Sequence, residues 1–200
     1  MIAQRRGALL VALAVCLAFG CRPSPRPAVI RSPQDIYWAE LQALCGRAFA
    51  GRLTEGAAGD SIMRRSELIM HVRRCTPNEL RIPFHVGADR SRTWVLTRTN
   101  AGIRLKHDHR HADGSEDSVT QYGGDTRSDG SATQQEFYAD AFTATLIPAA
   151  RTNVWTMEMA PMDKRFAYAL RREGTDRRIR VEFDLGRAVP TPPAPWGADR

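Results

Sequence analysis

The sequence predicts an all-β domain, an antiparallel up-and-down meander of roughly ten strands that closes into a barrel after one N-terminal helix. Three observations predict it. Apolar and polar residues alternate with a period of two over most of the chain after residue 46, short glycine-containing turns separate the alternating segments, and no segment after residue 60 keeps a helical period for a dozen residues. A sheet with so many strands tends to close, which removes its open edges. A two-sheet β-sandwich is the alternative, because alternation does not distinguish the two.

Residues 1–20 have the pattern of an export signal and are set apart from the fold. A basic start is followed by an apolar run over residues 8–19, too short for a membrane-spanning helix of about 20 residues. The run leads into Leu17-Ala18-Phe19-Gly20-Cys21, which resembles the lipobox of bacterial lipoproteins. The resemblance implies cleavage before Cys21 and a lipid anchor on its thiol. Because Arg22 follows, it also implies the periplasmic face of the outer membrane, with a secreted soluble protein as the alternative.

Prolines mark both ends of the mature chain. Residues 21–31 contain three prolines and predict a stiff, extended tether. Residues 188–200 contain four prolines without periodicity and predict a loose tail. The folded domain is therefore expected over residues 32–187.

The domain opens with the predicted helix. Ser32-Pro33-Gln34-Asp35 has the residue types of a capping box, with proline at the first helical position. Tyr37, Leu41 and Leu44 follow at helical spacing and form an apolar stripe. Gly46 is of the type that ends a helix.

The cysteines predict one disulfide. Cys16 leaves with the signal and Cys21 would carry lipid, so Cys45 and Cys75 remain in an oxidising compartment. Two free buried thiols are the alternative. The absence of a CxxC motif gives no support to a redox or structural zinc site.

The strands follow in order, separated by turns such as Asn100-Ala101-Gly102 and Glu173-Gly174. Short connections favour antiparallel pairing between neighbours in the sequence. The predicted strands are 47–54, 67–75, 79–87, 92–99, 102–111, 118–126, 132–138, 142–147, 153–160, 165–172 and 177–185.

This pattern resembles the calycin group, the lipocalin and fatty-acid-binding-like barrels. The resemblance covers most of residues 36–185, and the stretch Leu44-Cys45-Gly46-Arg47-Ala48-Phe49-Ala50-Gly51 is similar to the entry into the first strand of such barrels. The lipocalin Gly-x-Trp motif is absent there. The runs RTWVLTRT and LKHDHRH are similar to runs in proteobacterial envelope proteins that have no assigned activity. The resemblance implies a cavity that holds a small ligand.

The strongest local signal is a histidine row in the strand 102–111. His107, His109 and His111 share a face with Ile103 and Leu105, while the residues between them are charged. If the apolar residues face the interior, the histidines line it. A row of this kind also suits a solvated barrel mouth, or direct contact with a haem or an acidic ligand.

A bound metal is a second interpretation of the row. Residues two apart on one strand face lie about 6.6 Å apart, so a metal could be held by His107 and His109 or by His109 and His111, and His107 and His109 are the preferred candidates. His107 and His111 lie about 13 Å apart, which is too far for all three to bind one ion. A further ligand would have to come from another strand. The candidate donors are His71, His85, Glu136 and Glu158.

Aromatic and arginine side chains complete the predicted cavity lining. An inward arginine is costly unless it is paired, so it indicates a buried ion pair or an anionic ligand. Core aromatics with arginine heads at the rim are the alternative. The candidates are Trp94, Arg98, Tyr122, Trp155, Tyr168 and Arg172.

The charge pattern and the absence of known catalytic motifs reduce the number of function classes that the sequence supports. The formal net charge is +7, and all but two of the 29 basic residues are arginine, yet no basic run exceeds two residues, so no nucleic-acid groove is predicted. GxSxG, HExxH, GxGxxG and Walker-type loops are absent, and no catalytic residue is predicted. We expect a monomeric envelope lipoprotein that binds a small amphipathic or anionic ligand or acts as an accessory protein. The alternatives are a metal-dependent enzyme or a metal- or haem-binding protein that uses the histidine row, and a structural interaction module.

Overall fold

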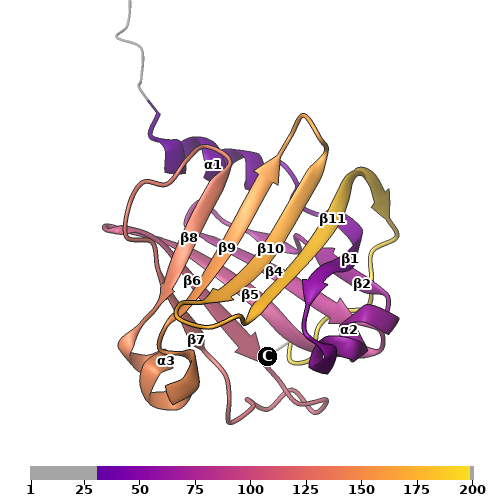
Figure 1. Cartoon of the computed structure of the whole chain (residues 1–200). Helices are drawn as coiled ribbons and strands as arrows, with labels where there is room; N and C mark the ends of the chain where they lie inside the picture. Colours follow the sequence, from indigo (N-terminus) through magenta and orange to yellow (C-terminus); the bar gives the residue numbers. More distant parts are fainter. Residues whose placement is uncertain (1–30, 199–200) are drawn as a thin grey trace, which may run out of the picture. The chain divides into compact units, whose positions relative to one another are not determined.

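The computed structural model describes residues 31–198 and confirms the predicted fold class: a closed antiparallel barrel of ten strands with one extra strand (Figure 1). The architecture is consistent with the calycin-like barrels. The strands are β1 (Ala48–Gly56), β2 (Leu68–His71), β3 (Arg74–Cys75), β4 (Glu79–Val86), β5 (Asp89–Thr99), β6 (Gly102–His109), β7 (Tyr122–Asp125), β8 (Gln134–Ala139), β9 (Asn153–Ala160), β10 (Arg165–Arg172) and β11 (Arg178–Val189).

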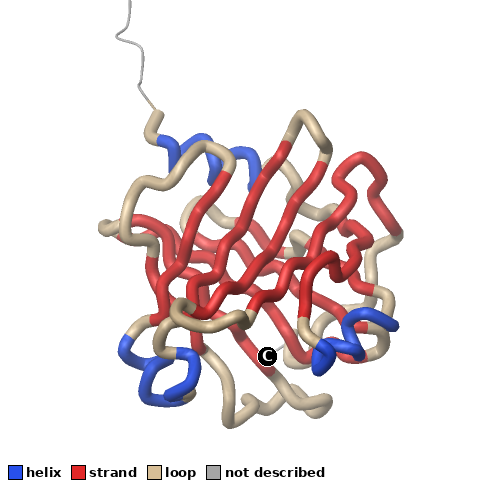
Figure 2. The backbone as a smooth tube through the Cα atoms, in the orientation of Figure 1, coloured by secondary structure: helices blue, strands red, loops and turns tan. Residues whose placement is uncertain are grey.

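The barrel closes through β2, which pairs with β1 on one side and with β4 on the other. From β4 to β11 each strand pairs with its neighbour in the sequence, and β11 returns to pair with β1. The extra strand β3 is short and pairs only with β4 among the described strands. Strands therefore dominate the tube in Figure 2, and short helical segments occupy its ends. A β-sandwich is excluded by this continuous ladder.

The apolar side chains of the alternating strands point inward and fill the interior of the barrel, as the sequence predicts. In β11, Val181 and Phe183 point inward and are buried, while the alternating residues Arg180, Glu182 and Asp184 carry charge on the outer face. Trp94 on β5 is at the centre of the core and contacts Phe166 and Phe183 from the opposite side of the barrel. The interior is thus packed with large aromatic side chains.

The predicted N-terminal helix is α1 (Pro33–Gln42). Ser32 and Asp35 form the capping box: the Ser32 hydroxyl accepts from the Asp35 N–H, and the Asp35 carboxylate accepts from the Ser32 N–H. Tyr37, Trp38 and Leu41 are buried in the core cluster. Figure 1 places α1 at one end of the barrel, so this helix covers that end with aromatic side chains.

The predicted strand 142–147 is wrong, because this segment is the helix α3 (Ala141–Leu146). Asp140 caps α3 by accepting a hydrogen bond from the Thr143 N–H at 2.8 Å. The buried Thr143 hydroxyl accepts from the N–H of Gly123 in β7 and donates to its C=O. This local capping outweighs the alternation of Phe142, Ala144 and Leu146.

Other short helical segments lie between the strands. They are η1 (Ala58–Asp60), α2 (Ser61–Arg65) and η2 (Pro148–Ala150). Figure 1 places α2 and α3 at the end of the barrel away from α1. No helix in residues 31–198 is both long and apolar enough to cross a bilayer.

Cys45 and Cys75 form the predicted disulfide. The bond joins the turn after α1 to β3, and thirty sequence positions separate its ends. It ties the helix that covers one end of the barrel to the wall beside it.

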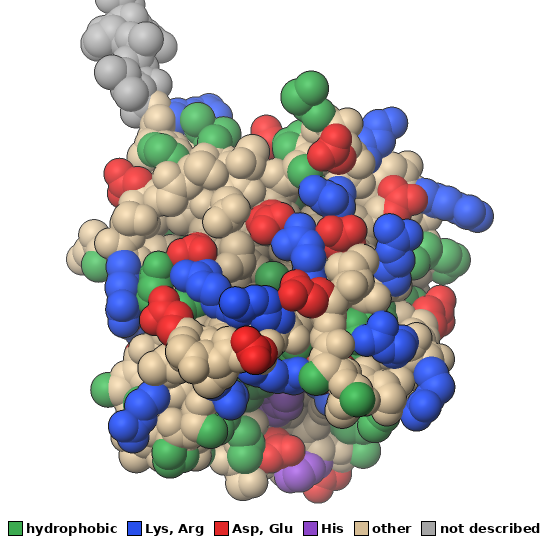
Figure 3. Space-filling model, viewed as in Figure 1, with side chains coloured by type: hydrophobic (Ala, Val, Ile, Leu, Met, Phe, Trp, Pro, Cys, Tyr) green, Lys and Arg blue, Asp and Glu red, His purple; other side chains and the backbone are tan. Residues whose placement is uncertain are grey.

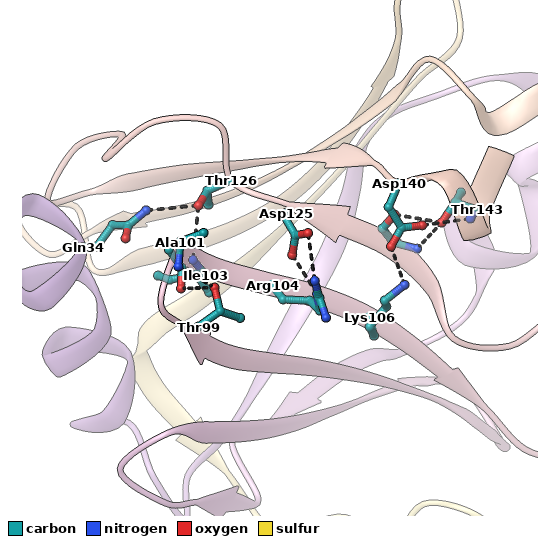
Figure 4. Close-up of polar contacts among 12 residues, drawn as sticks. Gln34, Thr99, Ala101, Ile103, Arg104, Lys106, Asp125, Thr126, Asp140 and Thr143 are labelled. Carbon is teal, nitrogen blue, oxygen red and sulfur yellow. Dashed lines mark hydrogen bonds and ion pairs between the residues drawn. The ribbon is translucent and has the colours of Figure 1, made fainter.

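The outer face carries rows of ion pairs across the strands. Arg180 on β11 contacts Glu158 on β9, and Arg171 on β10 contacts Glu136 on β8. Figure 3 shows the resulting mixture of basic and acidic side chains over the face formed by β8–β11. On β6, Arg104 contacts Asp125, and Lys106 contacts Asp140 (Figure 4).

The predicted signal peptide 1–20 and the lipidation site Cys21 lie outside the described residues, as does all of the predicted tether 21–31 but its last residue. The predicted tail 188–200 begins inside β11, which extends to Val189. Residues 190–198 then follow without a helix or strand.

Candidate functional site

A cavity of about 250 Å³ lies inside the barrel, at the end away from α1. Met63 from α2, Ile147, and Ala150 from η2 contribute to its lining, so the short helical segments form part of its mouth. Strands β4–β7 and β9–β11 provide the rest of the wall.

Three of the predicted cavity residues form an aromatic wall. Trp94 stacks on Tyr168 with ring centroids 4.4 Å apart, and on Phe84 at 4.9 Å on its other side. Trp155 on β9 also lines the cavity, and its ring centroid lies 5.2 Å from that of His107. Aromatic rings bury large areas with few rotatable bonds, so this wall is a preformed surface for a flat or apolar group.

His107 is buried and both of its ring nitrogens are hydrogen-bonded. Nδ1 lies 3.1 Å from the Tyr122 carbonyl oxygen, and Nε2 lies 2.8 Å from the Tyr168 hydroxyl. A carbonyl only accepts, so Nδ1 carries the proton and Nε2 accepts from the Tyr168 O–H. Burial lowers the pKa of His107 to about 3, and the ring is therefore neutral.

A second histidine–tyrosine pair lies next to the first. The Tyr122 hydroxyl lies 3.1 Å from His109 Nε2, and the Tyr122 ring stacks on His107 with centroids 4.5 Å apart. Burial, followed by the nearby Arg92 charge, lowers the pKa of His109. Burial also raises the pKa of Tyr122 to about 12. Both pairs are therefore uncharged polar groups in an apolar wall.

The cavity contains two arginines that differ in their partners. Arg92 forms an ion pair with Asp89 at 2.5 Å, and its side chain is 36% exposed. Arg172 donates from Nε to the Asn153 amide oxygen at 2.9 Å. No carboxylate pairs with Arg172 within the described part of the chain. Its guanidinium therefore brings an uncompensated positive charge to the cavity wall.

The structure separates two other candidates from the cavity. His111 follows the end of β6 and is exposed, so the histidine row breaks after His109. Arg98 lies near α1, where it pairs with Asp35 and its guanidinium lies 5.7 Å from the centre of the Trp38 ring. The cavity brings together Trp94, His107, His109, Tyr122, Trp155, Tyr168 and Arg172.

The other metal-donor candidates do not face the cavity. Glu136 and Glu158 are held in ion pairs on the outer face. His71 and His85 have the outward parity of β2 and β4, and neither lines the cavity. Among residues 31–198, no group of three or more His, Cys, Asp or Glu side chains is arranged to hold a metal ion. A metal on His107 and His109 remains a prediction, and it would require His107 to give up one of its two hydrogen bonds.

Sequence reasoning missed Arg92, Asn153 and the mouth residues Met63 and Ile147. Arg92 lies two residues before Trp94 on the same strand, so both side chains are on the same face of the sheet, and this spacing could have identified Arg92 as a cavity residue. The mouth residues had no such signal, because their position depends on where the short helical segments pack.

We expect acid to destabilise the protein through His107. Its pKa is lower in the folded state than the ordinary value of 6.5, so its contribution is complete above pH 6.5 and is lost as the pH falls toward 3. Between pH 8 and pH 5 the loss from His107 is about 2 kcal/mol. Urea unfolding at pH 8 and at pH 5 measures this difference in the free energy of unfolding. The decline should be smaller by that amount in His107→Gln and unchanged in His111→Gln, whose histidine is exposed. Equal declines in the parent and both variants would contradict this role.

No protein-family model, curated protein or solved structure matches this chain.

Proposed function

We propose that this protein binds a small amphipathic anion, with its apolar part against the aromatic wall and its negative group on Arg172. The observation that carries the proposal is the guanidinium of Arg172, which has no carboxylate partner among residues 31–198, in a cavity lined by Trp94 and Trp155. Transfer of a charge to a partly apolar site is unfavourable unless an opposite charge compensates it. A bound carboxylate would supply that charge and accept from the guanidinium fork.

The volume of the cavity favours a compact ligand. Sites for drug-sized molecules have roughly 300–1,000 Å³, and this cavity has about 250 Å³. A single ring with a short acidic group suits it better than a long lipid chain. The polar groups of the two histidine–tyrosine pairs would orient such a ring.

The state of the polar groups favours binding over catalysis. A general base needs an accessible lone pair and a pKa near the working pH. The lone pair of His107 is engaged by Tyr168, and burial keeps the pKa of this histidine far below neutrality. Burial also raises the pKa of the Tyr168 hydroxyl, which makes it a poor nucleophile.

The proposal includes export to the bacterial envelope, with a lipid anchor on Cys21 and a place at the periplasmic face of the outer membrane. The Cys45–Cys75 disulfide supports export, because disulfides persist in oxidising compartments. The lipobox-like sequence supports the anchor. A binding protein at this place would hold its ligand in the periplasm.

Two neighbouring arginines allow a matched test. Arg172 lines the cavity, whereas Arg171 points outward and pairs with Glu136. The probes are benzoate and cinnamate, with benzamide and cinnamamide as neutral counterparts, and the readouts are calorimetry and tryptophan fluorescence. We expect the acids to bind, Arg172→Gln to weaken them about tenfold, and Arg171→Gln to change their affinity less than about twofold.

Three results would overturn the proposal. The first is no binding by either acid. The second is equal binding of the acids and their amides, which would remove the role of charge. The third is an equal loss in Arg171→Gln and Arg172→Gln, which would indicate a general charge effect instead of a site.

A further inference from the structure

We propose a second binding site, for a phosphate-bearing ligand, in a groove between the outer wall of the barrel and the C-terminal segment 190–198. The groove has a volume of about 440 Å³, which is larger than the cavity inside the barrel. Its lining includes four arginines from the barrel and Trp196 from the segment. It shares no residue with the barrel cavity, so the two proposals are independent.

The C-terminal segment is fixed against the barrel by hydrogen bonds. The Trp196 N–H donates to the Arg90 carbonyl oxygen at 3.1 Å, and Arg90 Nη1 donates to the Ala194 carbonyl oxygen at 3.0 Å. Figure 1 shows this yellow end of the chain leaving β11 and running toward the opposite end of the barrel. The segment therefore forms one wall of the groove.

Two of the arginines are already compensated. Asp108 is buried in the floor and contacts Arg110 at 2.8 Å and Arg81 at 3.4 Å. Glu116 and Glu79 also contact these two arginines, from positions outside the groove lining. These contacts hold both guanidinium groups in place beside Asp108.

The other two arginines, Arg73 and Arg74, have no carboxylate partner among residues 31–198. Arg74 on β3 is also directly opposite Arg81 on β4. Arg81 is compensated by Asp108 and Glu79, so among the described residues the charge of Arg74 is the unpaired one at this position of the ladder. Arg73 and Arg74 both line the groove, so it presents two guanidinium forks that no carboxylate of residues 31–198 neutralises.

Phosphate is the chemistry that these groups suit. A guanidinium fork matches the oxygens of a phosphate group with two parallel hydrogen bonds, and two forks can share its double charge. Trp196 adds a flat apolar surface beside them, against which a sugar ring can pack. The ligand class is therefore a phosphorylated sugar, either free in solution or as the headgroup of a lipid.

The test uses the full chain and glucose 6-phosphate as the soluble probe. Calorimetry at low ionic strength should detect binding that weakens with salt. Arg73→Gln/Arg74→Gln should lower the affinity at least about tenfold. The control Arg151→Gln/Arg178→Gln removes the same charge from exposed positions outside the groove, and it should leave the affinity within about twofold.

A second arm identifies the source of the phosphate. Vesicles of phosphatidylcholine with phosphatidylinositol 4-phosphate present it on a lipid headgroup, and cosedimentation measures binding. Loss of vesicle binding in Arg73→Gln/Arg74→Gln alone would support the site with a lipid source. Binding of glucose 6-phosphate without the vesicles would support it with a soluble source.

Other outcomes overturn the proposal. No binding of either probe in the millimolar range would do so. An equal loss in the two double variants would assign the effect to overall charge. The variant Arg172→Gln separates the two proposals, because it should weaken benzoate binding and leave glucose 6-phosphate binding unchanged.

Discussion

Replacing Trp94 with alanine is expected to lower the free energy of unfolding by about 3–5 kcal/mol, the usual cost of truncating a buried tryptophan. Trp94 is 2% exposed and stacks between Phe84 and Tyr168. It also reaches Phe166 and Phe183 across the barrel. Its removal leaves a void that this rigid wall cannot fill, because the neighbouring rings are held by the strands on both sides.

Urea unfolding followed by circular dichroism measures this loss. Trp94→Phe keeps a ring in the stack and should lose markedly less stability than Trp94→Ala. Trp196→Ala is the matched control, because Trp196 lies in the C-terminal segment outside the core cluster, and we expect a change within about 1 kcal/mol. A stability of Trp94→Ala close to that of the parent would mean that the aromatic core is not packed as described.

The second large effect is expected from the disulfide. In the chain-entropy model, a bond between cysteines thirty positions apart stabilises the folded state by about 3–4 kcal/mol, because it restricts the unfolded chain. Cys45→Ala/Cys75→Ala should lose that amount. The parent should lose a similar amount when it is unfolded in the presence of a reductant.

Unfolding the double variant with and without a reductant provides the control. A reductant should not change the stability of Cys45→Ala/Cys75→Ala, since this variant has no bond to reduce. If the oxidised parent and the double variant unfold at the same urea concentration, the disulfide does not contribute as expected. We expect the reduced protein to keep the barrel, because β1, β2 and β4 are held by their own ladders.

The sequence predicted most of the barrel because its strands are half-buried. In β10, Phe166 faces the core and the charged Arg171 faces outward, and this alternation is visible without a structure. The prediction of a strand over residues 142–147 was wrong because a local interaction outweighed the alternation of these residues. In this interaction Asp140 caps α3 by accepting from the Thr143 N–H. The predicted strand 118–126 was too long, since β7 begins at Tyr122. A capping side chain and a strand boundary are decided by a few contacts that periodicity does not record.

The candidate site was predictable in part for the same reason. Parity placed Trp94, His107 and Tyr168 on the inner face, and all three line the cavity. Parity did not show which end of the barrel a residue occupies, so Arg98 and Arg172 were equivalent in the sequence. The structure sends Arg98 to Asp35 beside α1 and Arg172 to the cavity. The groove under the C-terminal segment had no sequence signal, because the segment reaches the barrel through backbone hydrogen bonds.

The pairing of β1 with β11 also determines when the protein can fold. Gly51 pairs with Phe183, so the first strand obtains one of its two neighbours from the last strand of the barrel. During synthesis the nascent chain therefore lacks the partner that completes the barrel until β11 has been made. Contacts between such distant segments also make folding slow, in the millisecond-to-second range for β-rich domains. The barrel can therefore close only after its last strand has been made.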